Sequence, residues 1–283
     1  MKYLRAFALT LLLLAIALAA TAANDAPFFF VQLADTQLGF TKGNSDLTTE
    51  IEHFTKAVEH INRLKPAFVI ISGDLVNAAH NPKQIRAFWK VAREISPGIP
   101  LHLVAGNHDV GNKPTAADVG SYTKLMGADH YSFSYNGTKF IVLDSALLGT
   151  GSDTVLRDAQ RKWFETELAA AQASKASHTF VCTHHPFFLT KPDEPDAYRN
   201  IPLAQRGDYL DLMNRYGVDY AISGHLHFVQ TARDRNVTLV TGGPLSKSIA
   251  KPPVVGLCIW RVYKDRVESQ FYGLDKLPES VKM

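Results

Sequence analysis

The chain has 283 residues, 46% hydrophobic and 20% charged, which are the proportions of a globular protein with one large core. It contains 30 Lys and Arg against 27 Asp and Glu, and two of the basic residues, Lys2 and Arg5, lie at its start. Without them the chain is nearly neutral, which argues against the extended basic surface of a protein that binds nucleic acid or a membrane.

Residues 1–23 have the pattern of a secretory signal peptide. Lys2 and Arg5 precede the apolar run AFALTLLLLAIALAA, and small residues in an Ala-Thr-Ala pattern follow it. We therefore expect cleavage of this leader and one domain over residues 24–283. The mature protein would be exported, to the periplasm or outside the cell, with no stable membrane insertion. An uncleaved anchor is the alternative, but the run is short for a membrane span.

Apolar runs bounded by turn signals predict strands, in chain order, at residues 28–34, 67–72, 101–106, 130–137, 139–145, 178–184, 218–224, 237–243 and 257–263. Cys182 and Cys258 lie inside two of these runs and are expected to be buried free thiols rather than a disulfide. The early runs alternate with helical patterns, whereas the later ones follow one another. This order predicts an α/β fold with mixed sheets, in which helices cover a first sheet and a second sheet packs against it.

Two of the intervening segments have helical periodicity. A helix over residues 48–64 would have an apolar face formed by Ile51, Phe54, Val58 and Ile61. In the segment 155–172 a similar stripe is formed by Leu156, Trp163 and Leu168.

Residues with metal-ligand chemistry follow five of the predicted strands. In chain order these are Asp35 and Gln37, then Gly73-Asp74, then GNHD at 106–109, then HHP at 184–186, then GHLH at 224–227. Because loops at strand ends converge on one crevice of an α/β sheet, they would bring carboxylate, amide and imidazole groups together. Taken singly, each loop could be an ordinary turn, and the alternate histidines of GHLH would point to one side of a strand. Five of the eleven histidines fall in these loops, and this clustering predicts a metal site.

With these motifs the chain resembles the calcineurin-like metallophosphoesterases. That superfamily is marked by D-x-H, G-D-x, G-N-H-[DE], a histidine before a proline, and G-H-x-H, in this order, and the matching motifs span residues 35–227. Within it, the stretches FFFVQLADTQLGF, ISGDLVNA, VAGNHDVGNKPTA and YSFSYNGTKFIVLDS look most like the calcineurin-like phosphoesterase domain-containing group, described as serine/threonine phosphatases. The departure is Gln37, where the superfamily usually has His.

The resemblance implies a four-layer αββα sandwich and a site for two divalent ions, which could be Mn, Fe, Zn or Mg. One ion would be held by Asp35, Gln37 and His227, the other by Asn107, His184 and His225, with Asp74 bridging both. His108 would approach the phosphate or the leaving oxygen, and Asp109 would orient it. His185 would lie behind the ligands, supporting them, or at the rim of the pocket.

Such a site predicts a hydrolase of phosphate esters, with a small-molecule or phosphorylated substrate and water as nucleophile. A phosphomonoesterase is the preferred function, and a diesterase for cyclic nucleotides or lipid headgroups is the alternative. The segment FFLTKPDEPDAYRNIPLAQR (187–206) could form the pocket wall that decides between them, or be a solvated loop. A protein of another class, which binds metal or phosphate without turnover, would be favoured if Gln37 fails as a ligand. The oligomeric state is not indicated.

Overall fold

The computed structural model describes residues 26–283. The expected leader over residues 1–23 lies outside the described residues, so its prediction stays open. Among the residues that are described, none of the helices combines the length and the apolar character needed to cross a membrane.

The strands form two mixed sheets, a five-stranded one in the order β11-β10-β1-β2-β3 and a six-stranded one in the order β4-β5-β6-β7-β9-β8. The first sheet contains β1 (Phe28–Leu33), β2 (Val69–Ile71), β3 (Leu101–Leu103), β10 (Gly256–Val262) and β11 (Val267–Gly273). The second contains β4 (Tyr131–Tyr135), β5 (Thr138–Val142), β6 (His178–Cys182), β7 (Tyr220–Ser223), β8 (Gln230–Asp234) and β9 (Val237–Thr241). The predicted motifs follow β1, β2 and β3 in the first sheet and β6 and β7 in the second. Within each sheet these strands are parallel, so their carboxyl ends lie at one edge.

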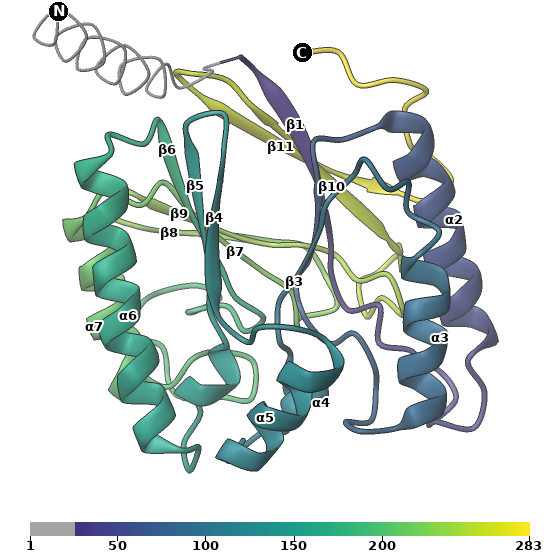
Figure 1. Ribbon diagram of the computed structural model, residues 1–283, viewed down its shortest axis with the longest axis horizontal. Coiled ribbons are helices and arrows are strands. Elements are labelled where there is room, and N and C mark those ends of the chain that lie inside the picture. The colour runs from purple at the N-terminus through teal and green to yellow at the C-terminus, as the bar shows by residue number, and fades with distance from the viewer. Residues whose placement is uncertain (1–25) are drawn as a thin grey trace, which may run out of the picture.

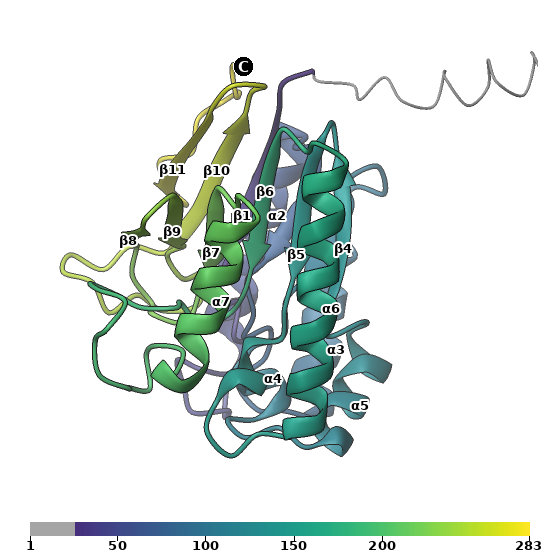
Figure 2. The same cartoon turned by 90° about the vertical axis from the view of Figure 1, so that its left-hand side faces the viewer.

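Helices cover the outer face of each sheet. In chain order the helices are α2 (Thr48–Leu64), α3 (Pro82–Ala92), α4 (Asn107–Val110), α5 (Ala116–Leu125), the 3-10 helix η1 (Ser145–Leu148), α6 (Thr154–Ala173) and α7 (Leu203–Arg215). Those that cover the sheets are α2, α3, α6 and α7. Figure 1 shows α2 and α3 on one side and α6 and α7 on the other, with both sheets between them. Seen from the side of α6 and α7, the same layers follow one another in depth (Figure 2), which confirms the expected four-layer arrangement.

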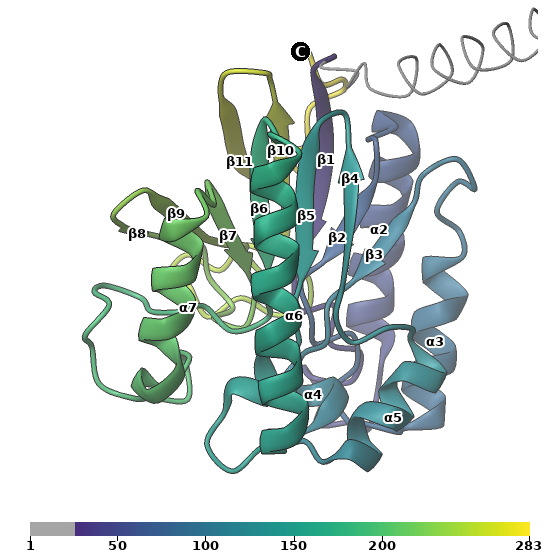
Figure 3. The same cartoon turned by 60° about the vertical axis from the view of Figure 1, so that its left-hand side comes forward.

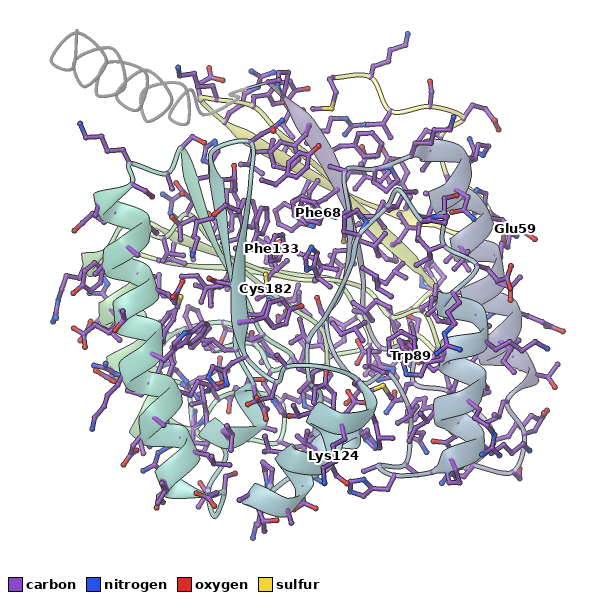
Figure 4. All side chains as sticks on the ribbon, in the orientation of Figure 1. Glu59, Phe68, Trp89, Lys124, Phe133 and Cys182 are labelled. Atoms are coloured by element: carbon purple, nitrogen blue, oxygen red, sulfur yellow. The ribbon has the colours of Figure 1, made fainter. Side chains whose placement is uncertain are left out.

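Three apolar cores separate these four layers. One lies between α2, α3 and the first sheet, one between α6, α7 and the second sheet, and one between the two sheets. β1 contributes to two of them, since Phe28 and Phe30 face the second sheet while Val31 and Leu33 face the helices. Figure 4 shows Phe68, Phe133 and Cys182 in the space between the sheets. Strands buried on both faces explain why the sequence has continuous apolar runs rather than alternation.

The cysteines and the first predicted helix are confirmed. Cys182 and Cys258 are buried and free. Phe54, Val58 and Ile61 of α2 are buried against the first sheet, and Ile51 packs at the margin of the same core.

For α6 the predicted stripe was partly wrong. Its buried face centres on Gln160, Phe164 and Leu168, whereas Trp163 is half-buried. Gln160 is buried because its amide accepts the Asp144 N–H at 2.8 Å and donates to the Asp144 carbonyl at 3.1 Å. Because the polar Gln160 belongs to the buried face, the apolar pattern of the sequence did not identify this face correctly.

Several elements were not predicted. β8 and β11 are edge strands with many exposed polar residues, so they contain no apolar run. The chain between β6 and α7, residues 183–202, forms a long loop beside α7 (Figure 3).

Candidate metal centre

The five predicted loops meet between the two sheets. The Asp35 carboxylate, after β1, accepts the backbone N–H of His225, after β7, at 3.1 Å. Nε2 of His184, after β6, lies 3.3 Å from Oδ1 of Asp74, after β2, and 3.1 Å from Oδ1 of Asn107, after β3. All five side chains are buried. The sheets therefore bring together the residues that the sequence placed in separate loops.

Many of the predicted ligands have an unusual backbone conformation. The positive φ values are 51° at Asp35, 36° at Gln37, 51° at Asp74, 71° at His225 and 57° at His227. Residues other than glycine rarely adopt this left-handed region, and where they do they cluster at functional sites. β7 ends before both histidines, so the expectation that they alternate along a strand is wrong. They lie in a turn held by contacts with the first sheet.

Glycines let these loops approach one another closely. A Cβ on Gly106 would lie 2.1 Å from the backbone nitrogen of Asp74, and one on Gly224 would lie 2.7 Å from the carbonyl oxygen of Ser72. No side chain fits at either position. The glycines of the GNHD and GHLH motifs are thus required by the packing of loop against loop.

The three predicted histidine ligands share one pattern of hydrogen bonding. A ring nitrogen of each lies close to a backbone carbonyl: His184 Nδ1 to Ser72 at 2.9 Å, His225 Nε2 to Tyr198 at 2.8 Å and His227 Nδ1 to Lys247 at 2.7 Å. Because a carbonyl can only accept, each of these nitrogens carries its proton. In the neutral form of each ring the other nitrogen has a lone pair, which is the state that a metal requires.

The acceptor atoms converge on one point. Nε2 of His184 lies 3.1 Å from Nδ1 of His225, 3.1 Å from Oδ1 of Asn107 and 3.3 Å from Oδ1 of Asp74. Burial would lower the pKa of His184, but the neighbouring Asp74 carboxylate raises it to about 9. Burial also acts on Asp74, yet His184 holds the pKa of that carboxyl well below its usual range. The cluster therefore favours positive charge, which a divalent cation would supply.

Asp35, Gln37 and His227 form the other part of the cluster. Nε2 of His227 lies 3.7 Å from Oδ1 of Asp35, whose pKa is raised by its burial. Oε1 of Gln37 is buried and has no hydrogen-bond partner among the described residues. A buried amide oxygen without a partner is unfavourable by about 1–3 kcal/mol, and ligation of a cation would satisfy it. The donor set therefore fits a second ion next to the first.

His108 and Asp109 are both present at the site, but they do not contact each other as expected. Nδ1 of His108 donates to the Asn77 carbonyl at 2.7 Å, so Nε2 is left to face the cleft. The Asp109 carboxylate accepts the backbone N–H groups of Leu75 at 2.9 Å and Gly106 at 2.8 Å. Burial and the nearby Asp74 raise the pKa of Asp109 to about 8. Asn77 orients His108, while Asp109 joins two ligand loops.

His185 lies beside the cluster. Its ring centroid is 4.4 Å from that of His225, and its Nδ1 is 3.0 Å from the Ser145 hydroxyl. It can be grouped with His184 and His225 as a possible metal site, because one ring nitrogen of each lies within 4.8 Å of the others. His185 also lines a neighbouring cleft of about 380 Å3. It is not among the residues that line the cleft over the predicted ligands.

A cleft of about 220 Å3 opens onto the cluster. Its lining residues are Gln37, Phe40, Asp74, His108, Tyr198, Arg199, His225, Leu226, His227 and Ile249. Tyr198 and Arg199 come from the segment 187–206, so part of that segment does form a wall of the pocket. The sequence did not identify either residue individually, because only the prolines and aromatics of the whole segment suggested that it forms a pocket wall.

Comparison with known proteins agrees with this geometry. The model of the family described as calcineurin-like phosphoesterase matches residues 30–229. The chain is 34% identical over 267 residues to the serine/threonine-protein phosphatase CPPED1 of Rattus norvegicus, covering 89% of this chain and 85% of that one. It is 32% identical over 270 residues to the CPPED1 of Homo sapiens, covering 89% and 86%.

Solved structures show the same fold. A dimetal phosphatase from Danio rerio superposes with a TM-score of 0.68 at 16% identity, covering 87% of this chain and 96% of that one. A purple acid phosphatase from Lupinus luteus gives 0.69 at 15% identity, covering 89% and 52%. From the matched family model and the extent of the similarity to its relatives, the chain belongs to the calcineurin-like phosphoesterase family.

Proposed function

We propose that this chain is a phosphomonoesterase that uses two divalent ions. The observation that carries the proposal is the convergence of the seven predicted ligands on one buried cluster at the base of a cleft that also contains His108 and Arg199. One ion would be held by Asp35, Gln37 and His227 and the other by Asn107, His184 and His225, with Asp74 between them.

The two donor sets favour different ions. The first has two oxygen-bearing side chains and one imidazole if Gln37 ligates through Oε1, so it suits Mn2+ or Mg2+. The second has two imidazoles and suits Zn2+ or iron. We propose that the second site is filled first and that added Mn2+ or Mg2+ completes the first.

Two ions in such a site polarise the phosphoryl group and activate water at neutral pH. Side chains of the protein would supply the proton for the leaving group and a cation that binds the phosphoryl group. His108 has one ring nitrogen fixed by the Asn77 carbonyl, and its other nitrogen faces the cleft, where it can give a proton to the leaving oxygen. Arg199 is exposed at the cleft and forms no ion pair with any acidic side chain of residues 26–283. Its guanidinium is therefore available to bind a phosphoryl group in a forked geometry.

The charge on Arg199 favours a monoester over a diester. A phosphate monoester is largely a dianion at neutral pH, whereas a diester is a monoanion, so a fixed cation interacts more strongly with the monoester. The phosphatase names of the relatives point to the same class and suggest a phosphorylated serine or threonine side chain as one substrate.

The test is hydrolysis of p-nitrophenyl phosphate, its bis ester and a phosphoserine peptide, each with added Mn2+. A higher kcat/KM for the monoesters is expected, a preference for the bis ester would favour the diesterase alternative, and no turnover by the metal-loaded protein would favour a binding protein. Arg199→Ala should reduce kcat/KM for p-nitrophenyl phosphate about 10-fold more than for the bis ester, since one charged hydrogen bond is worth about 1.5–3 kcal/mol. Arg86→Ala, an exposed arginine on α3, is the control.

We also propose that the mature protein is exported. The leader pattern of residues 1–23 is the support for this. N-terminal sequencing of the protein recovered from its native host should begin near Ala23 or Asn24. An active protein that retains Met1 in the cytoplasm would contradict it.

A further inference from the structure

Tyr198 connects the long loop 183–202 to two of the predicted ligands of the second ion. Its backbone carbonyl accepts the Nε2–H of His225 at 2.8 Å, and its ring centroid lies 4.7 Å from that of His225. Its hydroxyl accepts a hydrogen bond from Nδ2 of Asn107 at 3.0 Å. One exposed residue thus contacts both ligands, through its main chain, its ring and its hydroxyl.

These contacts determine which atoms face the metal. The Tyr198 carbonyl fixes the proton on Nε2 of His225, so the lone pair on Nδ1 points toward His184. The Tyr198 hydroxyl and Oδ1 of Asn112 hold Nδ2 of Asn107, so Oδ1 of Asn107 points toward His184 as well. Rotation of either side chain would replace a ligand atom by an N–H group, which repels a cation.

The loop that carries Tyr198 is held by a polar network of its own. The Glu194 carboxylate accepts the backbone N–H groups of Leu189 and Thr190, each at 2.9 Å, and the Asn200 amide at 2.8 Å. The fully buried guanidinium of Arg206, in α7, donates to the Glu194 carbonyl at 2.7 Å. These hydrogen bonds give a loop without regular secondary structure a defined conformation, and they hold the backbone of Tyr198 in a fixed position.

Tyr198 also stands between two clefts. It lines the cleft of about 220 Å3 over the cluster and the neighbouring one of about 380 Å3. A change in the loop would therefore act on the substrate cleft and on the ligands of the second ion together.

We propose that Tyr198 is a positioning residue for the second metal ion, held in place by the Glu194 network. This rests on the proposed dinuclear site. Groups that orient metal ligands commonly change metal affinity 10- to 100-fold when they are removed. Asn112 still holds Asn107 when the Tyr198 hydroxyl is lost, so the lower end of that range applies to the hydroxyl alone.

The experiment measures metal binding directly. Apoprotein of wild type and of Tyr198→Phe is titrated with Zn2+ and then Mn2+ by calorimetry, and bound metal is determined after equilibrium dialysis. Tyr198→Phe keeps the ring and the carbonyl and removes only the hydroxyl. We expect the second-site Kd to rise about 10-fold while the first-site Kd is unchanged. Tyr135→Phe, a change of the same kind on β4, is the control and should bind both ions as wild type does.

A second variant tests the support from the loop. Glu194 contacts none of the proposed ligands. Glu194→Gln should nevertheless weaken metal binding at the second site, because it removes part of the network that holds the loop carrying Tyr198. Unchanged metal affinity in Tyr198→Phe would overturn the role of Tyr198, and unchanged affinity in Glu194→Gln would overturn the role of the network. A wild-type protein that binds fewer than two ions would instead overturn the dinuclear site, so the two failures are distinguishable.

Discussion

Replacement of Gln37 by Met should have opposite effects on the metal-free and the metal-loaded protein. In the absence of metal, buried Oε1 of Gln37 has no partner among the described residues, and such a group costs about 1–3 kcal/mol. Met has a similar length and no polar group to satisfy. The free energy of unfolding of the Gln37→Met apoprotein should therefore equal that of wild type or exceed it by up to about 2 kcal/mol.

With metal the sign reverses, because the variant lacks a ligand of the first ion. If the first-site Kd rises about 10-fold, the stabilisation by saturating Mn2+ falls by about 1.4 kcal/mol. The assay is urea unfolding of both proteins, once with chelator and once at a fixed excess of free Mn2+. Gln37→His is the companion variant, and its imidazole should tighten the first site and reduce the need for added metal.

Gln84 provides a matched control for this prediction. It is also a buried glutamine, but its Oε1 accepts the Ala78 N–H at 2.8 Å and its Nε2 donates to Asn44 at 2.7 Å. Gln84→Met should therefore destabilise the protein equally with and without metal. If Gln37→Met behaved like Gln84→Met, with an unchanged Mn2+ titration, Gln37 would be a structural residue outside the metal site.

Three further predictions concern the other acidic and basic groups. Asp74→Asn should remove nearly all turnover and leave fewer than two ions per chain by metal analysis, because the neutral amide no longer offsets two cations; wild-type activity and metal content would make Asp74 a turn residue only. His108→Ala should retain both ions and lose about 10²- to 10⁴-fold in kcat, with a smaller loss for better leaving groups; an equal loss across leaving groups would assign His108 to charge stabilisation. Asp144 is fully buried, and burial raises its pKa from 3.8 to about 7. Because this carboxyl prefers to be protonated in the folded state, stability is lost as the pH rises from about 4 to 7. Asp144→Asn should therefore be more stable than wild type above pH 7, by at most about 4 kcal/mol, and not at pH 4; urea unfolding at both pH values that shows no such difference would refute this.

The strand-end motifs could be found in the sequence because each combines a buried strand with a ligand in the next few residues. Asp35, Asp74 and His184 follow apolar runs directly, and the geometry of parallel strands then brings them together. The turn at His225 could not be found in this way. Its conformation depends on the hydrogen bond to Asp35, which lies 190 positions earlier in the chain. Local spacing therefore suggested a strand where the structure has a left-handed turn.

The substrate wall was harder to predict than the ligands. Tyr198 and Arg199 have no neighbouring motif, and their position depends on Arg206, which lies on α7 and bonds to the carbonyls of the loop. A buried arginine cannot be told from an exposed one by its residue type. What the sequence did indicate was a long segment with prolines and aromatics after a ligand histidine, which is a common composition for a functional loop.

The ligand loops also show how the metal-free protein is destabilised at its own site. Asp35, Gln37 and Asp74 adopt left-handed backbone conformations, and each such residue costs about 1–2 kcal/mol relative to the ordinary regions. The surrounding sheets hold these groups in place at the expense of stability, so the site is formed before a cation arrives. Binding then needs little rearrangement, and most of its free energy is available to hold the ions.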